Sequence, residues 1–191
     1  MTFEIHGRWR KGYAFDLHTV ASTYLAPDEF GHDRFENARS EMGNLVYRLK
    51  YQNDRTVVPR IVGLLDGIRG IEEFGAIIPV PSSRKARPYQ PVDEITKALG
   101  VRRNVPVLAG FLAKAVGDQV KNVDDPEERR LLLEGSIVIA GRETIAGRHV
   151  LLVDDLYRSG ATLDACCSVL LDHAKVASVC VLTMTRTRIR R

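Results

Sequence analysis

The apolar residues of the chain fall into short runs separated by segments with helical spacing. A run of four, Val150 to Val153, is too short to form the face of a helix and predicts a buried strand. The same pattern predicts further buried strands at 76–81, 107–114, 136–140 and 177–184. Each of the later strands follows a polar or helical segment, which is the order found in α/β proteins.

Apolar residues spaced three and four apart predict helices between these strands. Helices are expected over 35–51, over 55–71, over 91–99 and directly after Thr162. Strands that alternate with helices favour right-handed crossovers and a mostly parallel, twisted sheet with helices on both faces. Ligands of such sheets lie beyond the carboxyl ends of the strands, so we expect the functional residues there.

The first 35 residues differ from the rest because they are rich in aromatic residues and show no helical period. Short strands or turns are expected in this part. We therefore predict an N-terminal extension, or hood, over 1–35 and one main α/β domain over 36–191.

Composition excludes several classes of protein. The 191 residues are 45% hydrophobic, which suits one globular domain with a sizeable core. No stretch approaches the roughly 18 apolar residues of a membrane-spanning helix, and the N-terminus lacks the apolar core of a secretory signal. Of three cysteines two are neighbours, Cys166 and Cys167, which argues against a disulfide framework and for the cytoplasm. No pair of CxxC motifs is present, so a structural zinc site is not expected.

The net charge is +4, and four arginines lie in the last six residues. A basic tail leaves nucleic acid open as a partner, although such an end is commonly only solvated. A basic cleft for an anionic small molecule accounts for the charge equally well.

Residues 149–162 carry the strongest chemical signal. The strand at 150–153 ends on two adjacent carboxylates, Asp154 and Asp155, and a turn with a glycine and two hydroxyl residues leads into the next helix. Free backbone N–H groups at a helix N-terminus favour a phosphate, and the carboxylates suit vicinal hydroxyls or a hydrated divalent cation. The implied ligand is a sugar phosphate with Mg²⁺.

Two other interpretations of this segment stay open. An ordinary strand-to-helix junction would use the acids only as caps or as solvated groups. A receiver-type phosphoacceptor aspartate would also follow an apolar strand, but its acids come early in a domain and these come late.

The segment resembles the signature of the type I phosphoribosyltransferases, which bind 5-phosphoribosyl-1-pyrophosphate (PRPP). The resemblance implies that Asp154 and Asp155 hold the ribose 2′- and 3′-hydroxyls as the catalytic acids. It also implies that the following loop wraps the 5′-phosphate through Tyr157, Arg158, Ser159, Gly160, Ala161 and Thr162. Where the family usually has Thr-Thr-Gly, this chain has Arg158-Ser159-Gly160, so an arginine replaces one hydroxyl.

Three further segments resemble the ComF-type branch of that superfamily: 47–51 (YRLKY), 78–81 (IPVP) with the basic loop after it, and 119–129. Members of the branch commonly begin with a four-cysteine zinc module, which is missing here. A Gly-Phe-Asn-Gln motif is replaced by Pro-Tyr-Gln-Pro at 88–91, which puts the recognition of the acceptor in doubt.

The resemblance also nominates residues for the leaving group and for a loop that closes over the cleft. The loop after the strand at 76–81 would contact pyrophosphate through Ser82, Ser83, Arg84 and Lys85. The segment corresponding to the mobile loop offers Lys114, Gln119, Lys121 and Arg129. Lys50 is expected to end a helix, where a cation is favoured in any case.

The expected function is therefore transfer of phosphoribose from PRPP to an unknown acceptor with release of pyrophosphate. The expected cofactor is Mg²⁺, carried by the substrate and not by a dedicated protein cage. The alternative is a non-catalytic PRPP- or nucleotide-binding regulator, with a role in competence or DNA uptake suggested only by the name of the branch. No membrane partner is expected, and a dimer is compatible with the sequence.

Overall fold

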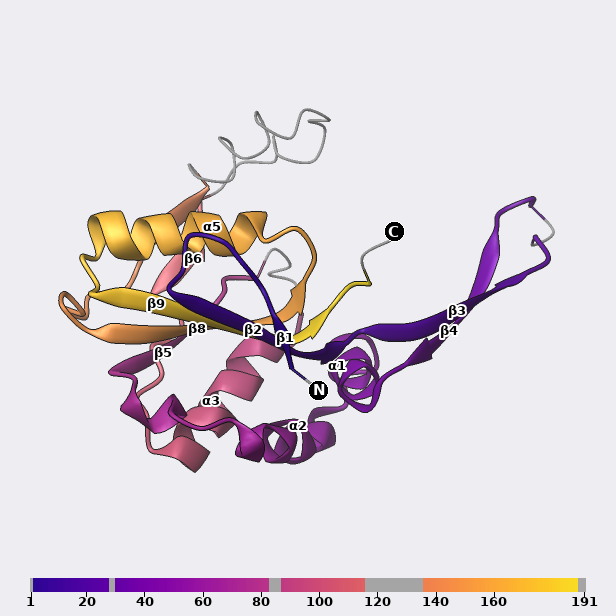
Figure 1. Cartoon of the computed structure of the whole chain (residues 1–191), viewed down its shortest axis with the longest axis horizontal. Coiled ribbons are helices and arrows are strands. Elements are labelled where there is room, and N and C mark those ends of the chain that lie inside the picture. The colour runs from indigo at the N-terminus through magenta and orange to yellow at the C-terminus, as the bar shows by residue number, and fades with distance from the viewer. Residues whose placement is uncertain (1, 28–29, 83–86, 116–135, 189–191) are drawn as a thin grey trace.

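A five-stranded sheet forms the centre of the molecule, with the strand order β1-β2-β9-β8-β5 (Figure 1). The computed structural model describes residues 2–27, 30–82, 87–115 and 136–188. The strands of this sheet are β1 (Phe3–Glu4), β2 (Lys11–Leu17), β5 (Ala76–Pro79), β8 (His149–Tyr157) and β9 (Ser178–Arg186). β2, β9, β8 and β5 are parallel, and β1 is antiparallel to β2 at one edge. The expected mostly parallel sheet is confirmed.

Helices cover both faces of this sheet, as predicted (Figure 1). One face carries α1 (Glu41–Tyr51), α2 (Val58–Leu64) and α3 (Pro91–Arg103), and the other carries α5 (Ala161–Ser168), which continues as the π-helical turn η5 (Val169–His173). Each face has its own hydrophobic cluster. In β8, Val150 and Leu152 belong to the cluster under α5, while Leu151 and Val153 belong to the cluster under α1 to α3.

Two of the expected helices have different bounds. Residues 34–39 form strand β4 (Arg34–Arg39), and α1 begins only after Ser40, whose hydroxyl accepts a hydrogen bond from the Gly43 N–H at 3.0 Å. The expected helix over 55–71 is divided into η1 (Arg55–Val57), α2, η2 (Leu65–Gly67) and η3 (Ile71–Glu73). Pro59 lies in the first turn of α2, where a residue without an N–H is tolerated, so the helix starts anew there.

The prediction that residues 107–114 and 136–140 add strands to the central sheet is wrong. Only β6 (Leu112–Lys114) and β7 (Ile137–Ile139) form, and they pair antiparallel in a separate small sheet. Val107 contributes no more than a single bridge to Ile77. Gly110, at φ +79°, turns the chain away from the sheet before β6 begins.

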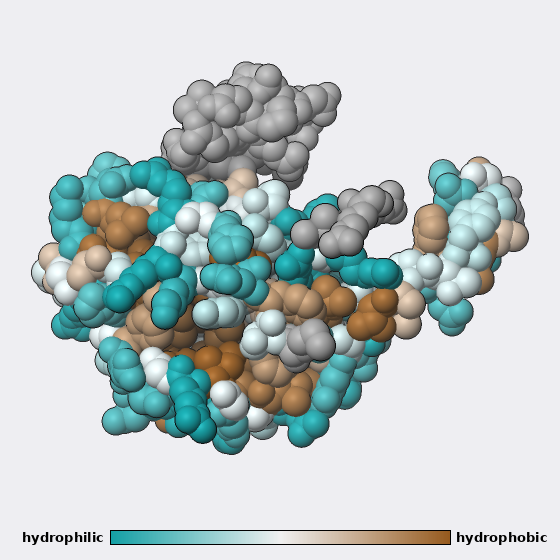
Figure 2. All heavy atoms as spheres, viewed as in Figure 1, coloured by the Kyte–Doolittle hydropathy of each residue, from teal (hydrophilic) through white to brown (hydrophobic). Residues whose placement is uncertain are grey.

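A hairpin of β3 (Thr19–Leu25) and β4 projects from the body of the molecule (Figure 1). It carries exposed aromatic side chains, among them Tyr24 and Phe35, whose rings meet at 5.5 Å, and apolar and polar residues are mixed on its surface (Figure 2). Residues 3–4 and 11–17, part of the expected extension, instead lie in the central sheet. The division at residue 35 stays a prediction. None of the described helices is long and apolar enough to span a membrane.

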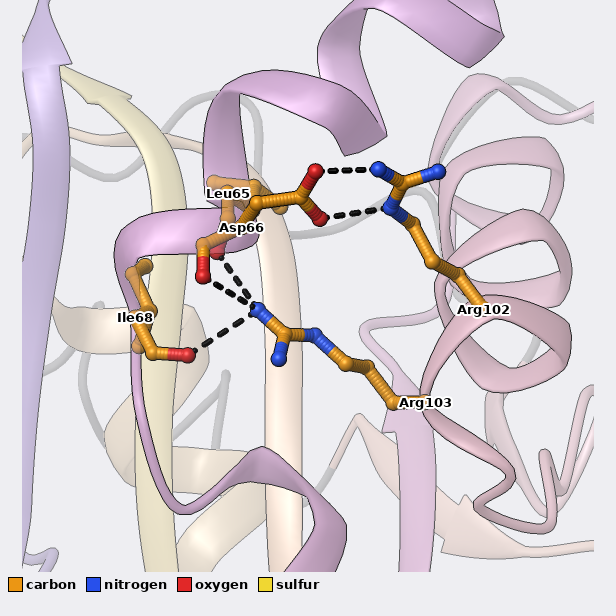
Figure 3. Close-up of polar contacts among 5 residues, drawn as sticks. All are labelled: Leu65, Asp66, Ile68, Arg102 and Arg103. Carbon is orange, nitrogen blue, oxygen red and sulfur yellow. Dashed lines mark hydrogen bonds and ion pairs between the residues drawn. The ribbon is translucent and has the colours of Figure 1, made fainter.

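Two neighbouring arginines fasten the end of α3 to the turn after α2 (Figure 3). A terminal nitrogen of Arg103 donates to the carbonyl oxygens of Leu65, Asp66 and Ile68 at 2.9 to 3.0 Å. Arg102 instead forms a two-pronged ion pair with the Asp66 carboxylate. The Leu65 carbonyl also accepts the Ile68 N–H at 3.0 Å, so Arg103 adds a second donor there and supplies a donor to the carbonyls of Asp66 and Ile68.

Candidate functional site

The carboxyl ends of the parallel strands bring the candidate residues to one edge of the sheet, as expected. Ser82 follows β5, the acid pair lies in the last part of β8, and His18 follows β2 directly. β8 is longer than the sequence predicts, since it continues through both acids to Tyr157. The acid pair is therefore held by strand pairing to β9 and not by a loop.

Asp154 and Asp155 belong to opposite faces of the sheet, because successive side chains of a strand alternate. Asp154 falls on the side of Val150 and Leu152, toward α5. Asp155 falls on the side of Val153, toward α1. A ligand that contacts both carboxylates must therefore lie across the edge of the sheet, beyond the end of β8.

Asp155 has a cationic partner. Lys50, in the last turn of α1, places Nζ 2.7 Å from Asp155 Oδ2. The two side chains are only 22% and 10% exposed, so this pair is shielded from water on most sides. The backbone carbonyl of Asp155 in turn accepts a hydrogen bond from the Thr185 hydroxyl at 2.9 Å.

Asp154 is the most strongly perturbed acid of the site. Burial, and next the negative charge of Asp155, raise the pKa of Asp154 to about 7. The Asp155 N–H, 2.8 Å from Asp154 Oδ1, opposes that rise, as do the charges of Lys50 and Lys114. Lys114, which the sequence assigns to the mobile loop, thus lies at the end of β6 within electrostatic range of the acid pair. The carboxyl can change its charge near neutral pH as a ligand arrives.

The expected phosphate loop forms the junction between β8 and α5. Gly160 is the N-cap of α5 at φ +84°, a left-handed conformation that suits glycine. No side chain caps this helix, so N–H groups of its first turn are not occupied by a cap. Arg158 and Ser159 are exposed, while Ala161 and Thr162 are half-buried in the first turn. This arrangement offers backbone donors and a hydroxyl to an anion.

Trp9 packs against the loop at 157–160, a contact that the sequence does not reveal. The centres of the Trp9 and Tyr157 rings lie 6.5 Å apart with the rings nearly perpendicular, and the Trp9 Nε1–H donates to the Ile5 carbonyl at 3.0 Å. Gly7 and Gly12 pack so closely against the indole that a Cβ at either position would lie within 2.4 Å of a ring atom. The N-terminal segment thus fixes the position of the loop.

The sequence did not predict three further residues near the acid pair: His18, Arg39 and Thr185. His18 contacts Thr185 through Nδ1 at 3.2 Å, and the guanidinium of Arg39 lies 3.9 Å from the centre of the Tyr47 ring. Burial, then the charges of Arg39 and Lys50, lower the pKa of His18 from its ordinary value of 6.5. Tyr47 and Lys50 belong to the segment at 47–51 that resembles the ComF-type branch, but no sequence signal marks His18 or Thr185.

Of the remaining sequence candidates, only Ser82 lies within the described residues. Ser82 is half-buried two residues beyond the hydrogen bond from the Val80 N–H to the Val153 carbonyl. The remaining candidates lie outside the described residues: Ser83, Arg84, Lys85, Gln119, Lys121 and Arg129. Within the described ranges, no group of three or more His, Cys, Asp or Glu side chains is arranged to hold a metal ion.

Comparison with known proteins gives similarity of structure only. No protein-family model matches the chain, and no curated protein matches it. An alanine mutant of an invariant aspartic acid in HPRTs is 19% identical over 78% of this chain and 73% of its own, with a TM-score of 0.40. A Trypanosoma cruzi hypoxanthine phosphoribosyl transferase is 16% identical over 91% and 74%, with a TM-score of 0.41. A hypothetical protein from Neisseria gonorrhoeae with bound ppGpp is 17% identical over 74% of both chains, also with a TM-score of 0.41. Since these scores lie below 0.5, the function proposed below rests on the residues of this chain.

Proposed function

We propose that the protein binds PRPP together with Mg²⁺ and transfers its phosphoribosyl group to an acceptor, with release of pyrophosphate. The observation that carries the proposal is the course of β8. Its last residues present the acid pair at the edge of the sheet, and the chain then turns at Gly160 into the uncapped N-terminus of α5. Sites for sugar hydroxyls and for a phosphate are thereby joined by a few residues, as a 5-phosphoribosyl group requires.

In this mechanism the protein acts mainly by position and charge. The loop at 157–162 holds the 5′-phosphate with backbone N–H groups and the Thr162 hydroxyl. The carboxylates accept hydrogen bonds from the ribose hydroxyls, and Lys50 keeps Asp155 in place. As the bond from C1 to pyrophosphate breaks, positive charge develops on the ribose, and nearby carboxylates stabilise it.

The donor set fits a Mg²⁺ ion that would be bound mainly by the substrate. It prefers oxygen ligands and keeps several waters, so two carboxylates near the ribose suffice without a protein cage. When bound it would neutralise charge on the leaving pyrophosphate. Ser82 at the end of β5, together with the sequence candidates Ser83, Arg84 and Lys85, would contact that group.

Two details of the assignment belong to the same proposal. Membership of the ComF-type branch is supported by Lys50, since a residue of the resembling segment contacts the acid pair. A reducing, cytoplasmic location is supported by the three cysteines, Cys166, Cys167 and Cys180, none of which forms a disulfide.

The direct test is calorimetry with PRPP and Mg²⁺. The wild type should bind, and the Asp154→Asn/Asp155→Asn variant should bind more than tenfold more weakly, because charged hydrogen bonds contribute about 1.5–3 kcal/mol each. Asp172→Asn, which removes an exposed carboxylate from η5, is the matched control and should bind as the wild type does. Unchanged affinity in the folded double variant would overturn the proposal.

Release of pyrophosphate then separates the enzyme from the regulator. Wild-type protein with PRPP, Mg²⁺ and a panel of nucleobases and amines should release pyrophosphate with at least one of them. Binding of PRPP without turnover across that panel would favour the regulatory module instead.

A further inference from the structure

The order of strands at the edge of the sheet indicates from which side an acceptor reaches the ribose. This step rests on the proposed function. Across the edge, β5 is followed by β8, then β9, then β2. If pyrophosphate leaves on the side of Ser82 and β5, a nucleophile that attacks in line must approach from the side of β9 and β2. His18, Thr185 and Arg39 lie on that side.

The hydrogen bonds of Thr185 fix the tautomer of His18. The Thr185 hydroxyl lies 2.9 Å from the backbone carbonyl of Asp155, and a carbonyl can only accept, so the hydroxyl hydrogen is used there. The same oxygen lies 3.2 Å from His18 Nδ1 and must accept a hydrogen from it. Neutral His18 therefore carries its proton on Nδ1 and a lone pair on Nε2. Among the described residues, Nε2 has no hydrogen-bond partner.

The charges around His18 keep the ring neutral at physiological pH. Arg39 faces it from β4 and Lys50 from α1, and both lower its pKa together with burial. Asp155 on β8 opposes them with the smallest effect, and Thr185 on β9 is uncharged. The backbone N–H of His18 also donates to the Arg186 carbonyl at 2.8 Å, which fixes the residue to the end of β9.

We infer that His18 Nε2 accepts the proton that the acceptor loses when it attacks C1 of PRPP. The attacking nitrogen forms the bond to C1, the bond from C1 to pyrophosphate breaks, and pyrophosphate leaves with that electron pair. The N–H proton passes to Nε2 and then to water, which restores the neutral ring. His18 in this role is a catalytic residue on the acceptor side of the site.

The same surroundings define the class of acceptor. Arg39 and Lys50 repel a protonated amine, so an ammonium group is a poor ligand here. A neutral heterocycle whose ring nitrogen carries a weakly acidic proton fits both the cations and the free lone pair. We therefore expect a ring N–H compound, such as a purine or pyrimidine base, and not an alkylamine.

The test uses His18→Asn, which keeps a donor near the position of Nδ1 for Thr185 and removes Nε2. With the best nucleobase of a panel of adenine, hypoxanthine and uracil, kcat should fall by about 10²- to 10⁴-fold. The affinity for PRPP should stay within twofold of the wild type. In the wild type kcat/KM should fall further in acid below pH 6.5 than in the variant, because only the wild type loses a neutral imidazole there, whereas Asp154 titrates in both proteins. Imidazole added to His18→Ala should restore part of the activity.

Each outcome decides between the two proposals. No binding of PRPP by the wild type would refute the proposed function itself. Binding with an unchanged kcat and the same pH profile as the wild type in His18→Asn would refute only the role of His18, as would transfer to an alkylamine in preference to every base. Binding of PRPP without transfer to any base would also refute the role of His18. Nitrogen-15 NMR of the wild type, which needs no variant to fold, should show the proton on Nδ1, and a proton on Nε2 would contradict the inference.

Discussion

Lys50 Nζ lies 2.7 Å from Asp155 Oδ2, so one of the two acids at the end of β8 is paired with a cation before any ligand arrives. The pair joins the last turn of α1 to the middle of the sheet edge. A buried carboxylate without such a partner would carry a large desolvation cost. Lys50 therefore lowers the cost of a charged acid at the site and fixes the position of its carboxylate.

The first prediction concerns this pair. Lys50→Met, Asp155→Asn and the double variant should show a coupling free energy of about 1–3 kcal/mol in urea unfolding, because the pair is largely shielded from water. The matched control is Arg60 with Glu41, an ion pair on the exposed side of α1 whose side chains are 62% and 54% exposed. Its coupling should stay below about 1 kcal/mol. Equal coupling in both cycles would mean that the Lys50 pair is no stronger than a surface contact.

The second prediction is a dependence of stability on pH caused by Asp154. Its pKa is raised from 3.8 to about 7 in the folded protein, so between those values the folded state holds a proton that the unfolded state has lost. The free energy of unfolding contributed by this group therefore falls as the pH rises from about 4 to 7. Asp154→Asn should flatten that decline, measured as the difference between the two proteins in urea titrations at pH 5 and pH 8. Parallel curves would contradict the assignment.

The third prediction concerns the turn at Gly160. Gly160→Ala places a Cβ at φ +84° and 3.1 Å from Tyr157 Cε2, and should cost about 1–2 kcal/mol in the free energy of unfolding. It should also weaken binding of ribose 5-phosphate by displacing the loop. Gly63→Ala is the control, because α2 leaves open space there and alanine favours helix by about 0.5–1 kcal/mol. A stabilised Gly160→Ala variant would show that the turn is not constrained.

The fourth prediction compares the two arginines at the end of α3 (Figure 3). Arg103→Met removes a half-buried donor from three carbonyls, together with a 3.8 Å ion pair to Glu72, and should lower the free energy of unfolding by about 1.5–3 kcal/mol. Arg102→Met removes an ion pair whose side chains are 48% and 47% exposed, and should cost less than about 1 kcal/mol. Thermal or urea unfolding of both variants measures the difference. If Arg102→Met cost more than Arg103→Met, the three carbonyls would be hydrated by water once Arg103 is removed.

The parts of the fold that could be predicted from the sequence are those with a strong local signal. The apolar run at 150–153, the acid pair and Gly160 mark β8 and the start of α5 because burial, charge and backbone conformation all act within a few residues. The parallel sheet follows from alternation of such signals. β2 gives almost no such signal, since its fully or nearly buried positions are the small residues Gly12 and Ala14, and its place depends on pairing with the distant β9.

The site was only partly predictable for the same reason. Asp154 and Asp155 are adjacent in the sequence, so their common location was evident. Lys50, His18 and Thr185 reach the site from three other elements, and contacts between such elements depend on packing of the whole sheet. Lys50 carried a sequence resemblance, yet its helix-end position explained it equally well until the contact with Asp155 was known.

Because side chains alternate in β8, the register of this strand decides which acid faces which side of the sheet. Deleting or inserting one residue between Val150 and Val153 would exchange the two faces. The aspartate next to Lys50 would then meet the cysteines of α5 and the apolar residues beneath that helix, and its neighbour would take the ion pair. Two adjacent and chemically identical residues are thus not interchangeable: one is paired with Lys50, and the other is buried without such a close cation, with a raised pKa. Swapping their surroundings by a one-residue shift should abolish ligand binding even though every functional residue remains in the chain.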